Sequence, residues 1–314
     1  MSLDRFSKSA LAKSAAFASI SVAILLVSLK TWAAWKTGSA AMLGSLADSA
    51  LDLVASVATL LGVWIAAQPA DENHRFGHGK AEALAAMFQV LLITISATGI
   101  AYRSTTQLID GTRIQSAPEG IGVSLIAIVA TVALLAWQRF VLARTGSVAI
   151  RADHVHYQSD LFLNLSVIAA LGLDAYLDIG WADPVFGLAI AAWLIFGAWR
   201  ASAAGIGELM DAEWPDAKRR AFVERAARHP ELSRMHDLRT RSAGNTDFVQ
   251  FHVDLPGEMT IDAAHDIIAR VETDLMRAFP GTEILIHIDP EGHVDEPGNP
   301  LVEMDEFDNL RSAQ

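Results

Sequence analysis

Two pairs of potential metal ligands, each spaced four residues apart, stand out within apolar stretches of the sequence. The first pair is Asp48 and Asp52, and the second is His156 and Asp160. Four residues make about one turn of an α-helix, so the members of each pair share a helix face. An ionised carboxylate inside a membrane helix is costly and by default indicates function. If the two faces meet, three carboxylates and one imidazole would form a nitrogen–oxygen site for a divalent metal such as Zn²⁺.

Competition between metal ions and protons is expected at such a site. Without a metal ion, repulsion between the carboxylates favours their protonation. The residues therefore predict a membrane transporter that exchanges a divalent cation for protons. The structural alternative is that these side chains only form hydrogen bonds between helices. Two pairs on separate segments favour this explanation less than a single Asp would. Asp153 lies on nearly the same helix face as His156. We expect it at a solvated helix end, with attraction of entering cations as the alternative.

A second cluster lies in the segment DENHRFGHGKAE, which follows the first pair. Asp71, His74 and His78 supply three nitrogen or oxygen donors, and Gly77 and Gly79 permit a tight backbone. We expect a metal site here that is weaker than the membrane site, with a polar turn as the alternative. Lys80 lies near the end of this segment, and Asp211 follows the last apolar stretch. An ion pair between them would couple the membrane helices to the C-terminal region, although solvated surface charges are the default.

A third cluster lies beyond residue 207, where the hydropathy falls. It contains four of the ten histidines and one carboxylate, namely His236, His252, His265, His287 and Asp289. His287 and Asp289 are two residues apart on a predicted strand and therefore share a face of the sheet. Asp289 could bridge two metal ions. A set of isolated structural histidines is the alternative, but five donors that can converge favour metal binding.

The composition limits the class of protein. Of the 314 residues, 52% are hydrophobic and only 19% are charged, below the roughly 25% typical of soluble domains. The formal net charge of −12 argues against a nucleic-acid partner, which would require a basic face. The sequence has no cysteine. Disulfides and thiolate ligands are therefore excluded, and soft ions such as Cu(I) are disfavoured.

The apolar segments predict an all-α transmembrane domain over residues 1–207. A spanning helix needs about 20 mainly apolar residues. Six segments qualify, at about 14–35, 39–66, 82–108, 119–143, 148–175 and 184–206. The N-terminal segment lacks a nearby cleavage site and is read as an uncleaved span. Lys and Arg concentrate at the N-terminus and in the second and fourth connections. Both termini are therefore predicted to be cytoplasmic, with the chain spanning the lipid bilayer of an inner (plasma) membrane.

Residues 208–292 are predicted to form a cytoplasmic α+β domain. Residues 215–229 have a helical pattern, and two alternating segments, MHDLRTRSA and TDFVQFHVDL, flank a Gly244-Asn245 turn. A helix at 260–279, with Thr260 as its N-cap, precedes a last strand, TEILIHIDP. The order α-β-β-α-β favours a ferredoxin-like fold. The acidic tail, 293–314, is expected to be disordered.

These motifs resemble the cation diffusion facilitator family of the bacterial YiiP type. The resemblance covers about residues 8–290. It rests on the six predicted spans and on the segments DSALD, QPADENHRFGHGKAE, RADHVHYQSD, HDLRTR and IHIDP. It implies a transport site, a loop site and a binuclear cytoplasmic site built from the three clusters described above, with Asp289 bridging the last. It also implies a homodimer in which Lys80 and Asp211 form a charge interlock near the interface.

The resemblance implies export of Zn²⁺ by alternating access, driven by protons, with Cd²⁺ and Fe²⁺ as further candidate ions. His156 matches the zinc- and cadmium-type members. Metal bound by the cytoplasmic domain would regulate the homodimer, and no enzymatic activity is expected. One alternative is a membrane-anchored metal sensor or buffer, which would have no need of intramembrane carboxylates. Another is an intramembrane metallohydrolase, for which the sequence offers no HExxH motif.

Overall fold

A computed structural model describes residues 3–37, 40–110, 119–177 and 181–312. The chain divides into two compact units, which we treat separately. One unit contains Ser7–Ile206, and the other contains Gly207–Gln314 together with Met1–Phe6. We call them the helical unit and the C-terminal unit.

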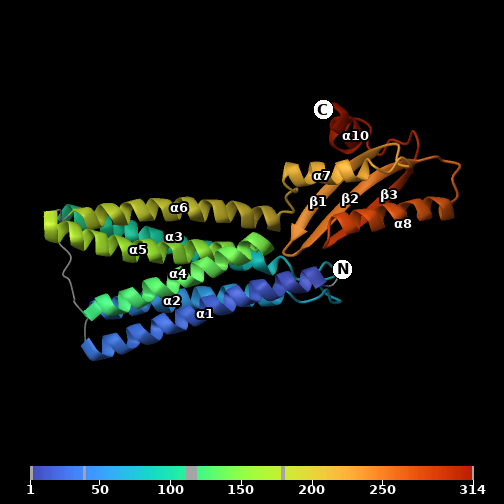
Figure 1. The fold of residues 1–314 in the computed structure, drawn as a ribbon. Helices are drawn as coiled ribbons and strands as arrows, with labels where there is room; N and C mark the ends of the chain where they lie inside the picture. Colours follow the sequence, from blue (N-terminus) through green and yellow to red (C-terminus); the bar gives the residue numbers. More distant parts are fainter. Residues whose placement is uncertain (1–2, 38–39, 111–118, 178–180, 313–314) are drawn as a thin grey trace. The chain divides into compact units, whose positions relative to one another are not determined.

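The helical unit is built from six long helices within the described residues (Figure 1). They are α1 (Leu3–Thr37), α2 (Ala40–Ala66), α3 (Ala81–Asp110), α4 (Glu119–Thr145), α5 (Val148–Leu177) and α6 (Ala182–Leu209). Each predicted span therefore corresponds to one helix, although α1 begins well before the predicted start at residue 14. Residue 39, the predicted start of the second span, lies outside the described residues.

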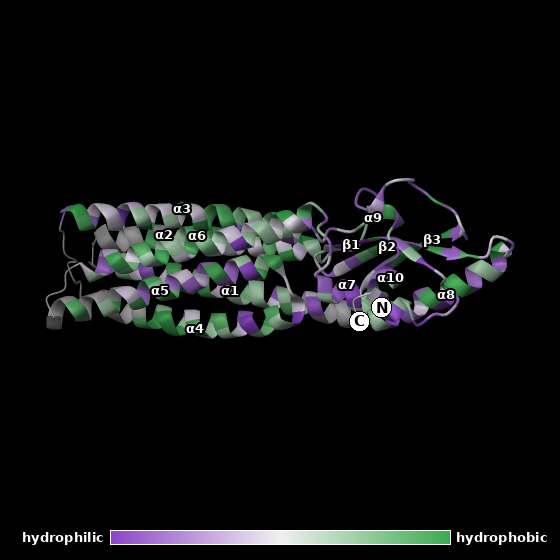
Figure 2. Ribbon diagram, turned by 90° about the horizontal axis from the view of Figure 1, so that it is seen from above, coloured by the Kyte–Doolittle hydropathy of each residue, from purple (hydrophilic) through white to green (hydrophobic). Residues whose placement is uncertain are grey.

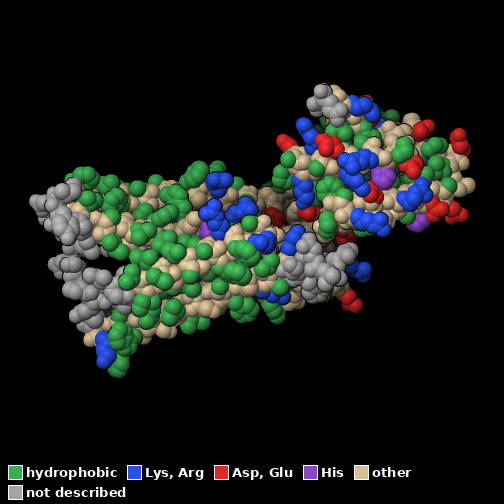
Figure 3. Space-filling model, viewed as in Figure 1, with side chains coloured by type: hydrophobic (Ala, Val, Ile, Leu, Met, Phe, Trp, Pro, Cys, Tyr) green, Lys and Arg blue, Asp and Glu red, His purple; other side chains and the backbone are tan. Residues whose placement is uncertain are grey.

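Five of these helices are long and apolar enough to cross a membrane, and α5 is the exception among the described residues. The first half of α5 carries the polar segment RADHVHYQSD, which lowers its hydropathy. Hydrophobic residues run along the helices of the unit (Figure 2), and hydrophobic side chains cover much of the surface in view (Figure 3). Trp35, for example, is 81% exposed and Trp199 74% exposed. An apolar exterior around polar side chains is what a lipid-embedded bundle requires.

Small residues let the helices approach closely. Many of the buried positions of the unit are alanines, among them Ala12, Ala15 and Ala16 of α1. A Cβ added to Gly62 of α2 would lie 2.3 Å from the Cβ of Ala85 in α3. Lipid tails are as apolar as the helix surfaces, so the hydrophobic effect does not drive membrane helices together. Their association depends instead on close packing of this kind.

The C-terminal unit has the predicted order of elements. They are α7 (Asp216–Ala226), β1 (Met235–Ala243), β2 (Thr246–Leu255), α8 (Ile261–Ala278) and β3 (Thr282–Pro290). The sheet order is β1-β2-β3, with β1 antiparallel and β3 parallel to β2. The predicted N-cap is confirmed, because the side chain of Thr260 accepts a hydrogen bond from the backbone N–H of Ala263 at 3.3 Å.

One face of the sheet packs against α7 and α8. The core contains Phe222 of α7, Leu275 of α8, and alternate residues of β2 such as Phe251 and Val253, all at most 1% exposed. Since successive side chains of a strand point to opposite faces, His252 between these two β2 residues lies on the other face. The packing of the core thus decides which face of the sheet carries the histidines.

The prediction of a disordered tail is corrected by the structure. Beyond residue 292 the chain forms two short helices, α9 (Pro300–Glu303) and α10 (Glu306–Ser312), which contact β1. Phe307 is 4% exposed and belongs to the main core, and Glu306 pairs with Arg219 of α7. The prediction rested on the acidic composition of the tail. It did not take account of the apolar side chains that anchor the tail or of the basic partners on other elements of the domain. Residues 313–314 lie outside the described residues.

Replacement of Gly62 tests the close contact between α2 and α3. Gly62→Ala should destabilise the helical unit by about 1–3 kcal/mol, because overpacking forces neighbouring atoms apart. Gly99→Ala is the matched control, since a Cβ at Gly99 of α3 meets nothing within 4 Å. Thermal unfolding of both variants in detergent would measure the difference. Equal midpoints would contradict the proposed packing constraint.

Candidate metal centres

The first centre lies between α2 and α5. His156 Nε2 is 2.9 Å from Asp52 Oδ1 and 3.8 Å from Asp160 Oδ2. One ligand atom from each of these three residues lies within 4.8 Å of the others. His156 is only 6% exposed, and Asp160 Oδ2 is buried without a hydrogen-bond partner. The three side chains therefore form a compact nitrogen–oxygen cluster with unused acceptor capacity.

Asp48, the fourth predicted ligand, is not part of this three-residue group, and it is exposed. It lies one helical turn before Asp52 on α2. Its neighbour Ser49 is buried and accepts a hydrogen bond at 2.7 Å from Lys30 Nζ of α1. The sequence analysis overlooked this lysine, although a basic side chain in an apolar segment is itself unusual.

Asp153 is fully buried, contrary to the expected solvated helix end. Its Oδ2 accepts hydrogen bonds from Ser19 Oγ of α1 at 2.5 Å and from Gln138 Nε2 of α4 at 2.8 Å. Ser56 Oγ of α2 lies 3.2 Å from Ser19 Oγ and 2.9 Å from the hydroxyl of Tyr157. This polar network joins α1, α2, α4 and α5 one turn from the metal-ligand cluster. We infer that it fixes the orientation of α5.

The loop cluster is present and exposed. His74 Nδ1 lies 3.3 Å from Asp71 Oδ1, and His78 Nε2 lies 3.4 Å from Asp71 Oδ2. Gly77 has a φ of 81°, in the region that favours glycine, and lies between the two histidines. Hydrogen bonds from the backbone N–H of His74, and also of Asn73, hold the pKa of Asp71 below its usual value. The carboxylate is therefore ionised at neutral pH and available to a cation.

The strand register places three histidines in one row across the C-terminal sheet. His252 of β2 is the partner of His236 on β1 and of His287 on β3. The pairing of β1 slips by one residue between His236 and Arg239, and Asp237 there has a φ of 46°. The slip is a β-bulge, which re-aims side chains at the end of a strand. It lets Leu238 enter the core while His236 stays on the histidine face.

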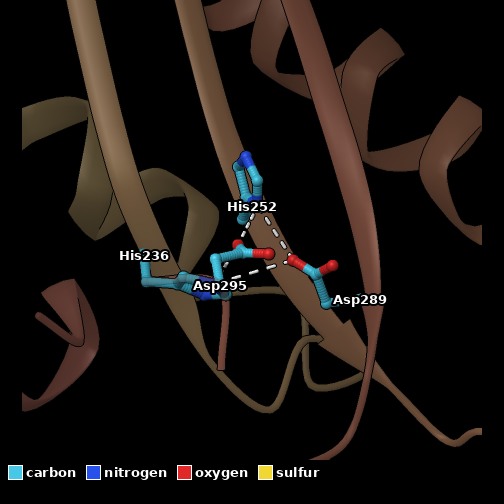
Figure 4. Close-up of side chains that lie close together, drawn as sticks. All are labelled: His236, His252, Asp289 and Asp295. Carbon is cyan, nitrogen blue, oxygen red and sulfur yellow. Dashed lines mark hydrogen bonds and ion pairs between the residues drawn. The ribbon is translucent and has the colours of Figure 1, made fainter. Parts of the chain in front are cut away.

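Two of these histidines converge with two carboxylates (Figure 4). The group is His236, His252, Asp289 and Asp295, whose ligand atoms lie within 4.8 Å of one another. Asp289 Oδ2 lies 2.8 Å from His252 Nδ1 and 3.6 Å from His236 Nε2. Asp295 belongs to the segment that was predicted to be disordered, so the sequence analysis missed it. One feature of the sequence could have indicated it. Asp295 follows closely after Asp289, and Gly292 between them, which has a φ of 88°, allows a turn that brings the chain back toward the sheet.

Further carboxylates face the outer nitrogens of both histidines. His236 Nδ1 lies 3.7 Å from Asp254 Oδ1, and His252 Nε2 lies 3.8 Å from Asp237 Oδ2. Histidines that bind metals usually present their second nitrogen to a carboxylate or carbonyl, which fixes the ring orientation. Burial raises the pKa of Asp254, although His236 and Arg234 oppose this shift. The donor set and its surroundings therefore fit a divalent metal.

The remaining predicted ligands lie outside this four-residue group. His287 is exposed, but its Nε2 is 3.4 Å from Asp289 Oδ1, the carboxylate oxygen that faces away from His236 and His252. This is the arrangement that a bridging carboxylate needs, and bridging stays a prediction. His265 of α8 is exposed and is not in the group.

The predicted charge interlock is not tested here, because Lys80 and Asp211 belong to different compact units. Within the C-terminal unit, Asp211 Oδ1 accepts a hydrogen bond from Arg241 Nη1 at 3.2 Å.

These features define a helical membrane protein that carries clustered metal-ligand side chains and an α/β accessory domain. Comparisons with known proteins agree. Residues 16–210 match the family described as the cation efflux transmembrane domain, and residues 214–291 match the cytoplasmic domain of cation efflux proteins. The chain belongs to the cation diffusion facilitator family of divalent-metal exporters.

Several relatives match over most of their length. The cation-efflux pump FieF of Salmonella arizonae is 40% identical over 278 residues, which are 88% of this chain and 92% of the pump. FieF of Salmonella paratyphi A is 40% identical over 286 residues, covering 90% and 94%. A solved structure of CzrB, described as its zinc form, covers 27% of this chain and 97% of its own chain, with 34% identity and a TM-score of 0.24.

Removal of one hydroxyl group tests the network around Asp153. Ser19→Ala deletes a donor to this buried carboxylate, and an unsatisfied buried group costs about 1–3 kcal/mol. Ser21→Ala is the matched control, because Ser21 is exposed on the same helix and bonds only the carbonyl of Phe17 among the contacts described. Its effect should stay within about 0.5 kcal/mol. Equal losses of thermal stability in detergent would contradict a structural role for the network.

Proposed function

We propose that this chain is a proton-coupled antiporter that exports Zn²⁺ from the cytoplasm by alternating access, with Cd²⁺ and Fe²⁺ as further candidate ions. The observation that supports this most directly is the cluster of Asp52, His156 and Asp160 between two membrane helices. Its donors are those that Zn²⁺ prefers, and Asp160 Oδ2, which is buried without a hydrogen-bond partner, offers a position for a cation. The family membership supports divalent-metal export in general.

Charge balance explains how one cluster could exchange metal for protons. Two or three carboxylates and a neutral imidazole can hold a divalent cation. Protonation removes the negative charge of the carboxylates, and on the imidazole it occupies the free lone pair and adds a positive charge. Protons arriving from outside would displace the metal ion, and the protonated site would then return inward. Alternating access needs α2 and α5 to reorient together, and the network from Ser19 to Tyr157 supplies contacts that could keep them aligned.

We assign Asp48 to the same site as a ligand that joins when metal binds. It shares a helix face with Asp52, and a tetrahedral site needs a fourth donor beyond the three that already converge. Its exposure makes it accessible to an entering cation.

The other two centres fit regulation better than transport. The C-terminal unit carries its own His and Asp cluster, and metal bound there would tighten a homodimer and bias its conformation. The pattern of Lys and Arg in the connections supports an inner-membrane protein with both termini in the cytoplasm. The loop cluster at Asp71, His74 and His78 would be a more exposed and weaker site.

Two competing functions make different predictions. A sensor or buffer would bind metal without moving it, and it would leave the membrane carboxylates without a purpose. A metallohydrolase would need an open ligand position beside a substrate cleft. Family membership favours transport over both.

Zinc flux in proteoliposomes tests the antiport. A pH gradient across the native protein should drive Zn²⁺ movement, and Asp52→Asn should reduce it to the level of protein-free vesicles because a ligand is lost. Asp110→Asn is the control, since it makes the same change at an exposed helix end. Flux that ignores the gradient would refute proton coupling, and equal flux in both variants would refute the site. Absence of flux in the native protein would favour the sensor.

The role of Asp48 has a separate test. Asp48→Asn should raise the Zn²⁺ concentration for half-maximal flux at least about tenfold, since even indirect partners of a metal contribute ten- to a hundredfold. The folding of the variant should match that of the native chain, because Asp48 is exposed. An unchanged half-maximal concentration would remove Asp48 from the site.

A further inference from the structure

We propose that Asp295 is a fourth ligand of the C-terminal metal centre, and that this ligand makes the docking of α9 and α10 dependent on a bound divalent cation. The inference rests on the proposed metal binding by the C-terminal unit. It differs from the ligand set that the sequence predicts there, because Asp295 comes from the tail beyond β3 (Figure 4).

The distances suit a single tetrahedral ion. Asp295 Oδ2 is 2.9 Å from His252 Nδ1 and 3.7 Å from His236 Nε2. The separations of Asp289 Oδ2 from the same two nitrogens are 2.8 and 3.6 Å. Ligands about 2.1 Å from a tetrahedral Zn²⁺ lie about 3.4 Å from one another. The four donors therefore surround a position of the right size within one chain.

Ion pairing alone explains the cluster less well. His252 Nδ1 carries at most one hydrogen, yet two carboxylate oxygens approach it equally closely. Asp295 Oδ2 is buried without a hydrogen bond of acceptable geometry. One hydrogen on His252 Nδ1 cannot serve both carboxylate oxygens at once, whereas a divalent cation could bind both oxygens together with the two imidazole nitrogens.

The segment after Asp295 is tied to the same strand as the centre. The backbone N–H of Glu296 donates to Glu303 at 3.0 Å, and Glu303 accepts from Arg234 at 3.1 Å, two residues before His236. Val302 and Phe307 supply the buried contacts of the two helices. Helices of four and seven residues are unstable alone, so their order depends on such anchors.

Metal binding and docking of the tail must therefore support each other. With the cation bound, Asp295 is neutralised and holds the start of the tail against β1. Without it, Asp295 and Asp289 share one nitrogen of His252, and the start of the tail is held less tightly. Linkage requires that a docked tail also raise the affinity for the metal. Release would uncover β1, which is an edge strand of the sheet.

Hydrogen exchange of the full chain in detergent tests this coupling, with Zn²⁺ titrated against a chelator. In the native chain, Zn²⁺ should slow exchange both in β1–β3 and in residues 299–312. In Asp295→Asn, protection of the strands should need at least about tenfold more Zn²⁺, and protection of the tail should be lost. Asp308→Asn is the control, because it removes one charge from an exposed position of α10 and should behave as the native chain.

The outcomes separate the two proposals. If the strands and tail of Asp295→Asn respond to Zn²⁺ as in the native chain, Asp295 is not a ligand and the inference fails, while metal binding by the unit stands. If Zn²⁺ changes nothing in the native C-terminal unit, regulation by this centre fails and the inference with it.

A second variant tests the coupling without removing a ligand. Arg219→Gln breaks the pair with Glu306 and loosens α10. Protection of the strands should then need more Zn²⁺ than in the native chain. An unchanged requirement would overturn the link between the metal and the tail.

Discussion

Neutralising carboxylates that water cannot reach is the constraint on which the helical unit depends. An ionised group that is buried without a partner costs several kcal/mol, so each buried Asp needs an arrangement that offsets this cost. Asp153 is supported by neutral donors, a serine and a glutamine from two other helices. Asp160 differs in its neighbours, because a ligand atom of Asp160 lies within 4.8 Å of ligand atoms of Asp52 and His156, whereas Asp153 belongs to no such group among the described residues. Asp153 Oδ1 and Asp160 Oδ2 are both buried without a hydrogen-bond partner, but only Asp160 has further ligands beside it that could share a cation. This contrast, more than the residue types alone, distinguishes the proposed transport site from the polar network beside it.

The same constraint explains the packing of the helices. Polar groups on α2 and α5 can meet only if the backbones come close, and alanine, serine and glycine at the contacts permit this. Gly187 of α6 illustrates the limit, since an added Cβ would lie 2.1 Å from Ser104 Oγ of α3. In lipid, such contacts replace the hydrophobic force that assembles soluble domains. The apolar side chains meanwhile face outward, as their exposure in Figure 3 shows. The helical unit is thus organised in the opposite sense to the C-terminal unit, whose largest apolar side chains are inside.

Much of the fold could be predicted from the sequence, because its signals are local. The spans follow from long apolar runs, and the strands from alternation around a Gly-Asn turn. Some ligands were predictable from spacing within one element, as for His156 and Asp160, and others from histidines on neighbouring predicted strands, as for His236 and His252. Asp295 was missed because acidic composition was taken as a sign of disorder, whereas Phe307 and the paired Glu306 anchor the segment. The burial of Asp153 could not be predicted either, since it depends on donors from α1 and α4 that no periodicity of α5 reveals. The β-bulge at Asp237 likewise depends on pairing with β2 and leaves no clear pattern in β1.

The three candidate centres share the same kinds of donor, His nitrogen and Asp oxygen, and differ in their access to water and in the segments that supply their ligands. The loop cluster is the most exposed, so hydration of its ligands competes with any ion, and the Asp71 carboxylate already accepts two backbone hydrogen bonds. The membrane cluster is enclosed, which strengthens its attraction for a cation but also for protons. The centre in the C-terminal unit is about as buried as the membrane cluster, with side-chain exposures of 1% to 24% against 8% to 24%. Its ligands come from three strands and a tail, so a bound ion there would join segments that are far apart in the sequence. A site whose ligands come together around the ion in this way is suited to sensing the metal concentration. A site between two helices, where protons compete with the metal for the same ligands, is suited to releasing its ion. The two proposed roles, regulation and transport, would then follow from the segments that each centre joins, with no change in ligand chemistry.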